Sequence, residues 1–412
     1  MFRRSLLALA AVLVAGCGGQ PGASIAPLGR STMSTADVVQ AKAVQSILQP
    51  AMGQPVTWNN SLSVHPDREA FPVLIDLLRG ARKTLWMETF EFADNDKARQ
   101  LTDLLIAKKK EGVDVRVIMD NIGAKSIGTA TAKVLRNNGV PTIVYGPFPF
   151  VRKTGHGLNI THRKLYLVDG DQGMTGGMNL GDEYFDHAHD MLWKVRGQAA
   201  HQLHQEFSTD WALGKGGRLE VPAAPTGAYG NEPIGMCVTS PRQTGREEEI
   251  RGVLLRALDS AKSRIDMAYP FFSDDRVVDR LIKAAKRGVD VRVILTKESH
   301  SAIEKLAIWS AKQAMPKGVK FHWWNTGYAH IKYTAVDGAF LLVGSSNADT
   351  LTFENNQELD LILTNPQTVA DFRGKVCDPD WASTPAVTEA EINVPWTQKP
   401  WIALLELIDR YI

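Results

Sequence analysis

The sequence has few cysteines, little net charge and only one long hydrophobic run. Among its 412 residues are 3 cysteines, and none lies at the short spacing that a zinc site needs. The formal net charge is +2, which provides no strong field for a polyanion. This balance disfavours a general nucleic-acid binder. Hydrophobic residues make up 44% and charged residues 22% of the chain, as in ordinary soluble domains.

The one long hydrophobic run stands at the start of the chain. Arg3 and Arg4 precede the apolar residues 5–15, a run too short to span a bilayer comfortably. Small residues then lead to Cys17, and this order predicts a secretory signal. The letters VAGC also resemble a bacterial lipobox. That resemblance implies a signal peptide over residues 1–16 and a lipid on Cys17; the alternative is an ordinary signal with an incidental cysteine.

Export carries three further expectations. Gly18 stands where an inner-membrane retention signal has aspartate, which favours the periplasmic face of the outer membrane if the host has two membranes. Residues 17–60 are rich in Gly, Pro, Ser, Ala and Gln and predict a flexible tether. Cys237 and Cys377 either form a disulfide, which an oxidising compartment permits, or remain two separate thiols.

The rest of the chain repeats itself. A helical pattern followed by an apolar strand opens at residue 71 and again at residue 250. Each copy continues with an amphipathic helix, a glycine and the letters VDVRVI, and each ends on Asp-Trp. Strands alternating with helices indicate α/β units. We therefore expect halves over 61–212 and 236–385, a linker over 213–235 and a tail over 386–412 with a short helix.

Each half contains the same polar motif. His162 and Lys164 lie two apart on a strand-like run, so their side chains share one face. A histidine there can attack phosphorus or move a proton, while the lysine holds a negative oxygen. Asn179 follows a glycine turn, from which its amide can donate to a phosphoryl oxygen. The second half repeats the set 168 positions later, as His330, Lys332 and Asn347.

The two motifs resemble the signature of the phospholipase D superfamily. That signature runs His-x-Lys, four residues, Asp, six residues, Gly-Gly or Gly-Ser and Asn, and both copies are complete, with Asp169 and Asp337 in the Asp position. The segments GGMNLGDEYF and GSSNADTLTFENNQELDLIL resemble the cardiolipin synthase branch, and the likeness covers roughly residues 65–385. Membrane-embedded members of that branch begin with spanning helices. Since this chain begins with a lipoprotein-type signal, their substrate and compartment do not carry over directly.

The resemblance implies an α/β fold of two similar sandwich halves, related by a pseudo-twofold axis and sharing one active site. By analogy His162 is the nucleophile that forms a phosphohistidine and His330 the general acid and base, although the sequence leaves the reverse assignment open. Glu358 and Asp190 are the candidates for orienting the histidines, and Asp169 and Asp337 are expected to be structural. The oxygens of the phosphoryl group are assigned to Lys164, Lys332, Asn179 and Asn347, without a metal or other cofactor.

Three functions remain open at this point. The first is a phospholipase D or phosphatidyltransferase that acts on phospholipids, as a monomer held at a membrane by its lipid and with no need of nucleic acid. The second is a metal-independent nuclease, and the third a silent lipid-binding or scaffolding lipoprotein. Aromatic residues precede each histidine and either line the site or pack in the core: Phe148, Phe150, Trp323 and Trp324. A lipid anchor favours the phospholipid reading.

Overall fold

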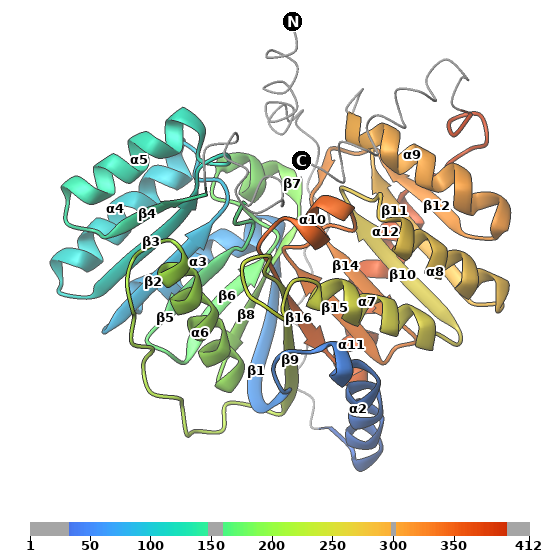
Figure 1. Cartoon of the computed structure of the whole chain (residues 1–412), viewed down its shortest axis with the longest axis horizontal. Helices are drawn as coiled ribbons and strands as arrows, with labels where there is room; N and C mark the ends of the chain where they lie inside the picture. The colour runs from blue at the N-terminus through green and yellow to red at the C-terminus, as the bar shows by residue number, and fades with distance from the viewer. Residues whose placement is uncertain (1–32, 147–159, 298–301, 394–412) are drawn as a thin grey trace, which may run out of the picture.

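The computed structural model describes residues 33–146, 160–297 and 302–393 (Figure 1). The signal, Cys17, Phe148, Phe150 and the helix expected in the tail lie outside these residues. The first half contains β1 (Thr57–Pro66), α3 (Ala70–Arg79), β2 (Thr84–Thr89), α4 (Asp96–Lys110), β3 (Asp114–Asp120), α5 (Lys125–Asn137), β4 (Thr142–Tyr145), β5 (Leu165–Val168), β6 (Gln172–Gly176), β7 (Ala188–His189), β8 (Met191–Arg196) and α6 (Gln198–Leu213).

The second half repeats the main elements in the same order, apart from the two-residue strands β7 and β13. It contains β9 (Glu232–Thr239), α7 (Glu249–Ser260), β10 (Arg264–Tyr269), α8 (Asp275–Lys286), β11 (Asp290–Thr296), α9 (Ala302–Ala314), β12 (Lys320–Trp324), β13 (Tyr328–Ala329), β14 (Tyr333–Val336), β15 (Phe340–Gly344), α10 (Thr350–Glu354), β16 (Glu358–Leu363), α11 (Pro366–Phe372) and α12 (Asp378–Ser383). Between the halves, residues 214–231 contain no helix or strand.

One sheet of 14 strands runs through both halves. From its centre outward, one side reads β1, β8, β6, β5, β2, β3, β4 and the other reads β9, β16, β15, β14, β10, β11, β12. The two series correspond strand for strand, and the central strands β1 and β9 pair antiparallel. A pseudo-twofold axis therefore passes between β1 and β9, which confirms the expected α/β fold of two similar halves.

Local sequence explains the matching elements. The side chains of strands such as β5 and β14 are buried along their whole length, as expected for a sheet that helices cover on both faces. The helices α4 and α8 begin at side-chain caps from Asn95 and Asp274 and end with lysines in the last turn. Gly112 and Gly288 follow them with φ near 90°, a conformation that glycine adopts without strain.

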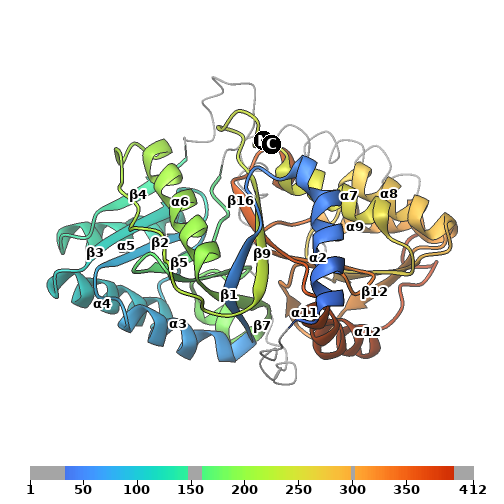
Figure 2. The ribbon, with the colours of Figure 1, turned by 90° about the horizontal axis from the view of Figure 1, so that it is seen from below.

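The expected tether is wrong over the part that the structure describes. Residues 35–48 form helix α2 (Thr35–Leu48), with Ser34 and Asp37 in a capping box, and β1 begins at Thr57 in the middle of the sheet. Figure 2 shows α2 along α7 and α11. The composition misled because α2 buries fully only Ala41 and Leu48, so the rest of its sequence is as polar as a linker.

The alternatives for the two cysteines also have an outcome. Cys237 and Cys377 are free, buried thiols, and burial raises the pKa of both well above its ordinary value. Of the two alternatives left open, the structure therefore has separate thiols. Within the described ranges, none of the helices combines the length and the apolar character needed to cross a bilayer.

Candidate active site

The two polar motifs face one pocket between the halves. His162 and His330 line it together with Asn179 and Asn347. Each histidine stands just before a strand, and its backbone N–H donates to a carbonyl of the other half: His162 to Gln357 at 2.9 Å and His330 to His189 at 2.9 Å. Each motif is thus anchored on the opposite half.

Each histidine pairs with a carboxylate of the opposite half. Nδ1 of His162 lies 2.9 Å from Oε1 of Glu358, and Nδ1 of His330 lies 2.6 Å from Oδ2 of Asp190. A carboxylate at Nδ1 favours the tautomer with the proton on that nitrogen, which leaves the Nε2 lone pair for chemistry. The two candidate orienting carboxylates therefore lie where that role requires.

Burial keeps both imidazoles neutral. Burial and the charge of Lys164 lower the pKa of His162 to about 4, although Glu358 acts in the opposite direction. The pKa of His330 is also lowered well below its ordinary value, first by burial and then by Lys332 and Lys164. A neutral imidazole at neutral pH is the form that attacks an electrophile.

The lysines contact the backbone of the histidines. The Nζ atoms of Lys164 and Lys332 donate to the carbonyls of His162 and His330, at 2.7 and 2.6 Å. Burial lowers their pKa values to about 7 and about 8. An ammonium has three donors, of which each lysine uses one on this carbonyl. The charges of both lysines act on both histidines, and such charges near the pocket suit an anionic ligand.

Both motif asparagines, Asn179 and Asn347, have a buried side-chain oxygen, Oδ1, without a hydrogen-bond partner among the described residues. The two ends of an amide exchange by a flip of the side chain, so either end can face a ligand. Leaving a buried polar atom unsatisfied costs about 1–3 kcal/mol, a cost that a polar ligand in the pocket removes.

The signature aspartates lie at the far ends of the motif strands. Asp169 and Asp337 have φ of 54° and 53° in the turns after β5 and β14. Their carboxylates accept hydrogen bonds from the backbone N–H groups that lead into β2 and β10. This geometry serves the strand ends rather than the pocket.

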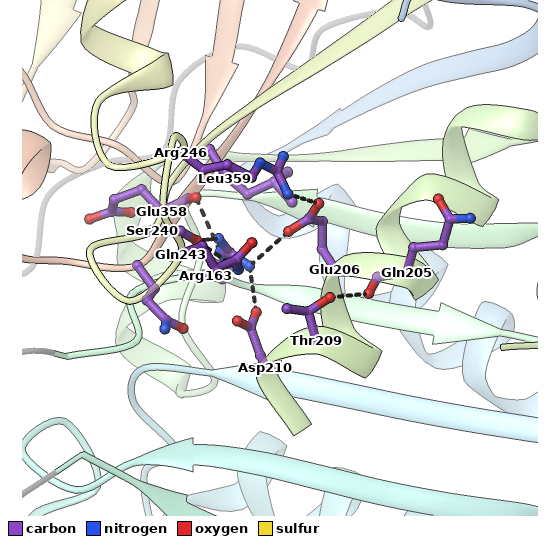
Figure 3. A network of polar contacts seen from close by, with 12 residues as sticks. Arg163, Gln205, Glu206, Thr209, Asp210, Ser240, Gln243, Arg246, Glu358 and Leu359 are labelled. Atoms are coloured by element: carbon purple, nitrogen blue, oxygen red, sulfur yellow. Dashed lines mark hydrogen bonds and ion pairs between the residues drawn. The ribbon is translucent and has the colours of Figure 1, made fainter. Parts of the chain in front are cut away.

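Sequence reasoning missed Arg163, the middle residue of the first motif. Its side chain is fully buried and lies between α6 and the second half (Figure 3). It pairs with Asp210 and donates to the backbone oxygen of Glu358 at 3.1 Å and to Ser240 at 2.6 Å. The sequence held two signals for this residue. The first motif has an arginine where the second has Ile331, and the Asp-Trp pair that ends the first half includes its partner Asp210.

The aromatic residues just before the second motif pack in the core and do not line the pocket. Trp323 and Trp324 are buried core residues, 2% and 6% exposed, and Trp324 stacks on His189. The pocket instead takes its aromatic lining from Phe90, Tyr184, Phe271 and Tyr328. In the part of the chain that the structure describes, no group of three or more His, Cys, Asp or Glu side chains could hold a metal ion. Metal-free chemistry stays a prediction.

Comparison with known proteins gives the family of the chain. The family described as "Cardiolipin synthase, PLD-like domain" matches residues 74–211 and 254–381, more than half of the chain. Cardiolipin synthase of Alkalihalophilus pseudofirmus is 28% identical over 76% of this chain and 65% of its own length. Cardiolipin synthase 2 of Bacillus anthracis is 28% identical over 73% of this chain and 60% of its own length. The chain thus spans less than two thirds of these curated relatives.

Solved structures share the fold at lower identity. Phosphatidylserine synthase of Haemophilus influenzae has a TM-score of 0.67 at 12% identity and covers 90% of this chain and 99% of its own. Polyphosphate kinase of Porphyromonas gingivalis has a TM-score of 0.57 at 12% identity and covers 85% of this chain and 52% of its own. At such identity the likeness concerns the fold alone.

Proposed function

Because the chain belongs to the cardiolipin synthase family of phospholipase D-like proteins, we propose that it transfers phosphatidyl groups from a phospholipid to an alcohol or to water. The observation that carries the proposal is the pair of histidine–carboxylate contacts facing one pocket, each built across the two halves. A phosphodiester bound there has one imidazole for attack and one for proton transfer.

The first step breaks the bond to the head-group alcohol. The Nε2 lone pair of His162 attacks phosphorus, and the departing oxygen takes a proton from Nε2 of His330. The phosphatidyl group is then bonded to His162 and the free alcohol leaves. His330 must be protonated beforehand; the anionic phosphodiester favours this, because a nearby negative charge raises the pKa of an imidazole.

The second step reverses the first with a new alcohol. The acceptor gives its proton to His330 while its oxygen attacks phosphorus, and the bond to His162 breaks. The charges of Lys164 and Lys332 and the amides of Asn179 and Asn347 stabilise the phosphoryl oxygens in both steps. Splitting one difficult displacement into two is the advantage of a covalent intermediate.

The names of the relatives support a phospholipid as donor, and so does the lipoprotein-type start of the sequence. We propose that Cys17 carries a lipid and holds the enzyme at a membrane surface, on the periplasmic side of the outer membrane if the host has two. Loss of membrane association in the Cys17→Ala variant, measured by fractionation, tests that anchor. Retention of the variant in the membrane fraction contradicts it.

The test of the reaction uses the full chain in mixed micelles with EDTA present. Phosphatidylglycerol and single-stranded DNA are offered separately, with ethanol as an acceptor in the first case. We expect phosphatidylethanol or phosphatidic acid to form and the DNA to stay intact. Neither lipid product should form with His162→Ala or His330→Ala. Cleavage of DNA alone supports a nuclease, and vesicle binding without turnover supports a silent lipid-binding protein; either contradicts the proposal.

A further inference from the structure

The residue just before each orienting carboxylate differs between the halves. His189 precedes Asp190, and Gln357 precedes Glu358. The backbone carbonyls of His189 and Gln357 act alike, since each accepts the N–H of a motif histidine from the other half. The two positions are therefore equivalent under the pseudo-twofold axis. One of them holds a neutral amide and the other an imidazole.

The imidazole of His189 lies between two carboxylates. Its Nδ1 is 3.1 Å from Oδ1 of Asp67, and its Nε2 is 3.4 Å from Oδ2 of Asp380. An ionised carboxylate only accepts hydrogen bonds, so both ring nitrogens carry protons and the ring is a cation. Burial acts against this charge, but Asp380 and Asp67 outweigh burial and raise the pKa of His189 well above its ordinary value.

Further contacts hold the ring of His189 in place. The residue is 7% exposed, and its ring stacks on that of Trp324, with centroids 4.6 Å apart and planes 5° from parallel. Asp67 follows strand β1 of the first half, whereas Asp380 and Trp324 belong to α12 and β12 of the second. Oδ1 of Asp67 also accepts the N–H of Asp190 at 3.1 Å. The ring thus joins both halves beside the backbone of Asp190.

The two orienting carboxylates receive different support. Glu358 accepts hydrogen bonds from the hydroxyl of Ser345 at 2.6 Å and from the amide of Asn356 at 3.1 Å. By their spacing from the motifs, the equivalent positions near Asp190 have no side-chain donor: Gly177 and Ala188. A Cβ at the glycine would lie 2.4 Å from Oδ1 of Asp190, so a serine does not fit there. Asp190 therefore needs another means of stabilising its charge.

The titratable groups that act on Asp190 come from both halves: His330, Lys332, Lys164, His189 and Tyr166. Burial raises the pKa of Asp190 to about 7, while the charges of Lys332, Lys164 and His189 act in the opposite direction. Burial also raises the pKa of Tyr166, so its phenol is neutral and adds no charge. The ionised form of Asp190 thus depends on the cations around it.

We propose that His189 is a positioning residue, whose positive charge keeps Asp190 ionised so that Asp190 holds the Nδ1–H of His330. The inference rests on the proposed transfer reaction, in which His330 exchanges protons with the alcohol. Among the described residues, those that line the pocket do not include His189. It acts on the reaction only through Asp190. At the other dyad, two side-chain hydrogen bonds stabilise Glu358 instead.

Loss of this charge changes the pH dependence in one direction. Without the charge of His189, the pKa of Asp190 rises further, so the carboxylate is protonated at higher pH. A protonated Asp190 no longer favours the reactive tautomer of His330. The acid limb of kcat/KM, which reports groups of the free enzyme, then moves to higher pH. A role in folding alone lowers kcat/KM equally at every pH.

The test measures kcat/KM from pH 5 to 10, with the full chain and phosphatidylglycerol in mixed micelles. His189→Gln removes the charge and introduces the residue found at the equivalent position. His189→Arg keeps a planar cation that stacks on an aromatic ring and pairs with carboxylates. The matched control is His204→Gln in α6, at a buried histidine whose ring nitrogens contact backbone groups of Ala200 and Gly170. Burial lowers the pKa of His204 to about 4, so its ring is neutral.

We expect His189→Gln to move the acid limb of kcat/KM up by about one pH unit, the low end of what a neighbouring charge does to a pKa. His189→Arg and His204→Gln leave the limb where the wild type has it. An acid limb that does not move in His189→Gln overturns the inference, as does an equal shift in His189→Arg; the proposed enzyme stands in both cases. Failure of the wild type to turn over phosphatidylglycerol overturns the proposed function and the inference with it.

A measurement on the wild type alone decides the matter if the variants do not fold. Neutron diffraction from crystals of the wild type at pH 7 locates the protons on the ring of His189. We expect a proton on both Nδ1 and Nε2. A ring nitrogen without a proton makes His189 neutral and overturns the inference, whatever the activity of the enzyme.

Discussion

At the residue scale, burial sets the charge states on which the chemistry depends. Without a ligand, His162 and His330 are neutral because burial disfavours their charged forms. A bound phosphodiester then favours the protonation of His330 that the first step needs. The same burial lowers the pKa of Lys164 to about 7 and that of Lys332 to about 8. The cations that balance the phosphate are therefore titratable near neutral pH, unlike ordinary surface lysines.

The lysines predict a fall in kcat/KM above about pH 7 to 8. A lysine with a lowered pKa is charged below that value and loses its charge as pH rises through it. Because kcat/KM reports groups of the free enzyme, binding of the phosphodiester weakens on the alkaline side. Initial rates with phosphatidylglycerol from pH 5 to 10 measure this. A value of kcat/KM that stays level up to pH 10 would falsify the assignment.

The orienting carboxylates predict a loss of turnover without a loss of binding. Asp190→Asn and Glu358→Gln keep the shape at Nδ1 but remove the charge that favours the reactive tautomer and the imidazolium. We expect kcat to fall about 10²- to 10⁴-fold, the usual contribution of a proton-transfer group, with KM nearly unchanged. Steady-state kinetics measure both values, and Asp96→Asn, at a side chain that is 94% exposed, is the control. Unchanged kcat in both site variants contradicts the role.

At the element scale, Arg163 links the first motif to helix α6 and strand β16 (Figure 3). Its guanidinium is fully buried among Asp210, Glu206 and the backbone oxygen of Glu358. A buried ion pair of this kind adds little net stability compared with an apolar pair, but removing one partner leaves an uncompensated charge. The link therefore matters for holding His162 and Glu358 in register.

We predict that loss of the Arg163 guanidinium greatly lowers the stability of the fold. We expect Arg163→Met to lower the free energy of unfolding by about 3–5 kcal/mol, because it strands the carboxylate of Asp210 in the core. Arg99→Met, at a side chain that is 61% exposed, costs at most about 1 kcal/mol. Urea unfolding followed by circular dichroism compares them. Equal urea midpoints for the two variants would show that the contacts of Arg163 do not stabilise the fold.

The repeated elements could be predicted from the sequence because their signals are local. Helical periodicity, Gly112 and Gly288, and the alternating pattern of the VDVRVI strands each act within a few residues. Helix α2 could not be predicted, since its small buried stripe packs against α7 and α11, which lie far away in the sequence. The contacts of Arg163 likewise come from segments 43 to 195 residues away. Pairings across such distances leave no spacing in the sequence to detect.

Some residues of the candidate site could likewise be predicted from the sequence and others could not. The histidines, lysines and asparagines were predicted because two complete motifs occur at equal offsets. The aromatic lining by Phe90, Tyr184, Phe271 and Tyr328 was not predicted, because these residues come together only where the two halves meet. Trp323 and Trp324 show the converse, since aromatic residues near a motif turned out to pack in the core.

At the scale of the whole molecule, the site exists only where the two halves meet. The central strands β1 and β9 pair across the pseudo-twofold axis, and both histidine–carboxylate contacts cross between the halves. A continuous sheet holds the halves at a fixed separation. The strand β1, which pairs with β8 and β9, therefore helps to hold the two halves of the site together.

Truncation tests this dependence. A chain beginning at residue 33 keeps α2 and β1, and we expect it to unfold cooperatively and to turn over phospholipid. A chain beginning at residue 67 lacks β1 and exposes the edges of β8 and β9, so we expect it to aggregate. Size-exclusion chromatography and thermal unfolding distinguish the two. A soluble, active chain from residue 67 would contradict a structural role for β1.

The most direct test of the account is to trap the covalent intermediate. Full-length protein is mixed with phosphatidylglycerol labelled with ³²P, quenched in alkali during the first turnover, and digested for peptide mapping. The account predicts alkali-stable label on the peptide that contains His162 in the wild type, and none in His162→Ala. Label that persists in His162→Ala, or turnover by the wild type with no labelled protein at any time point, would contradict it.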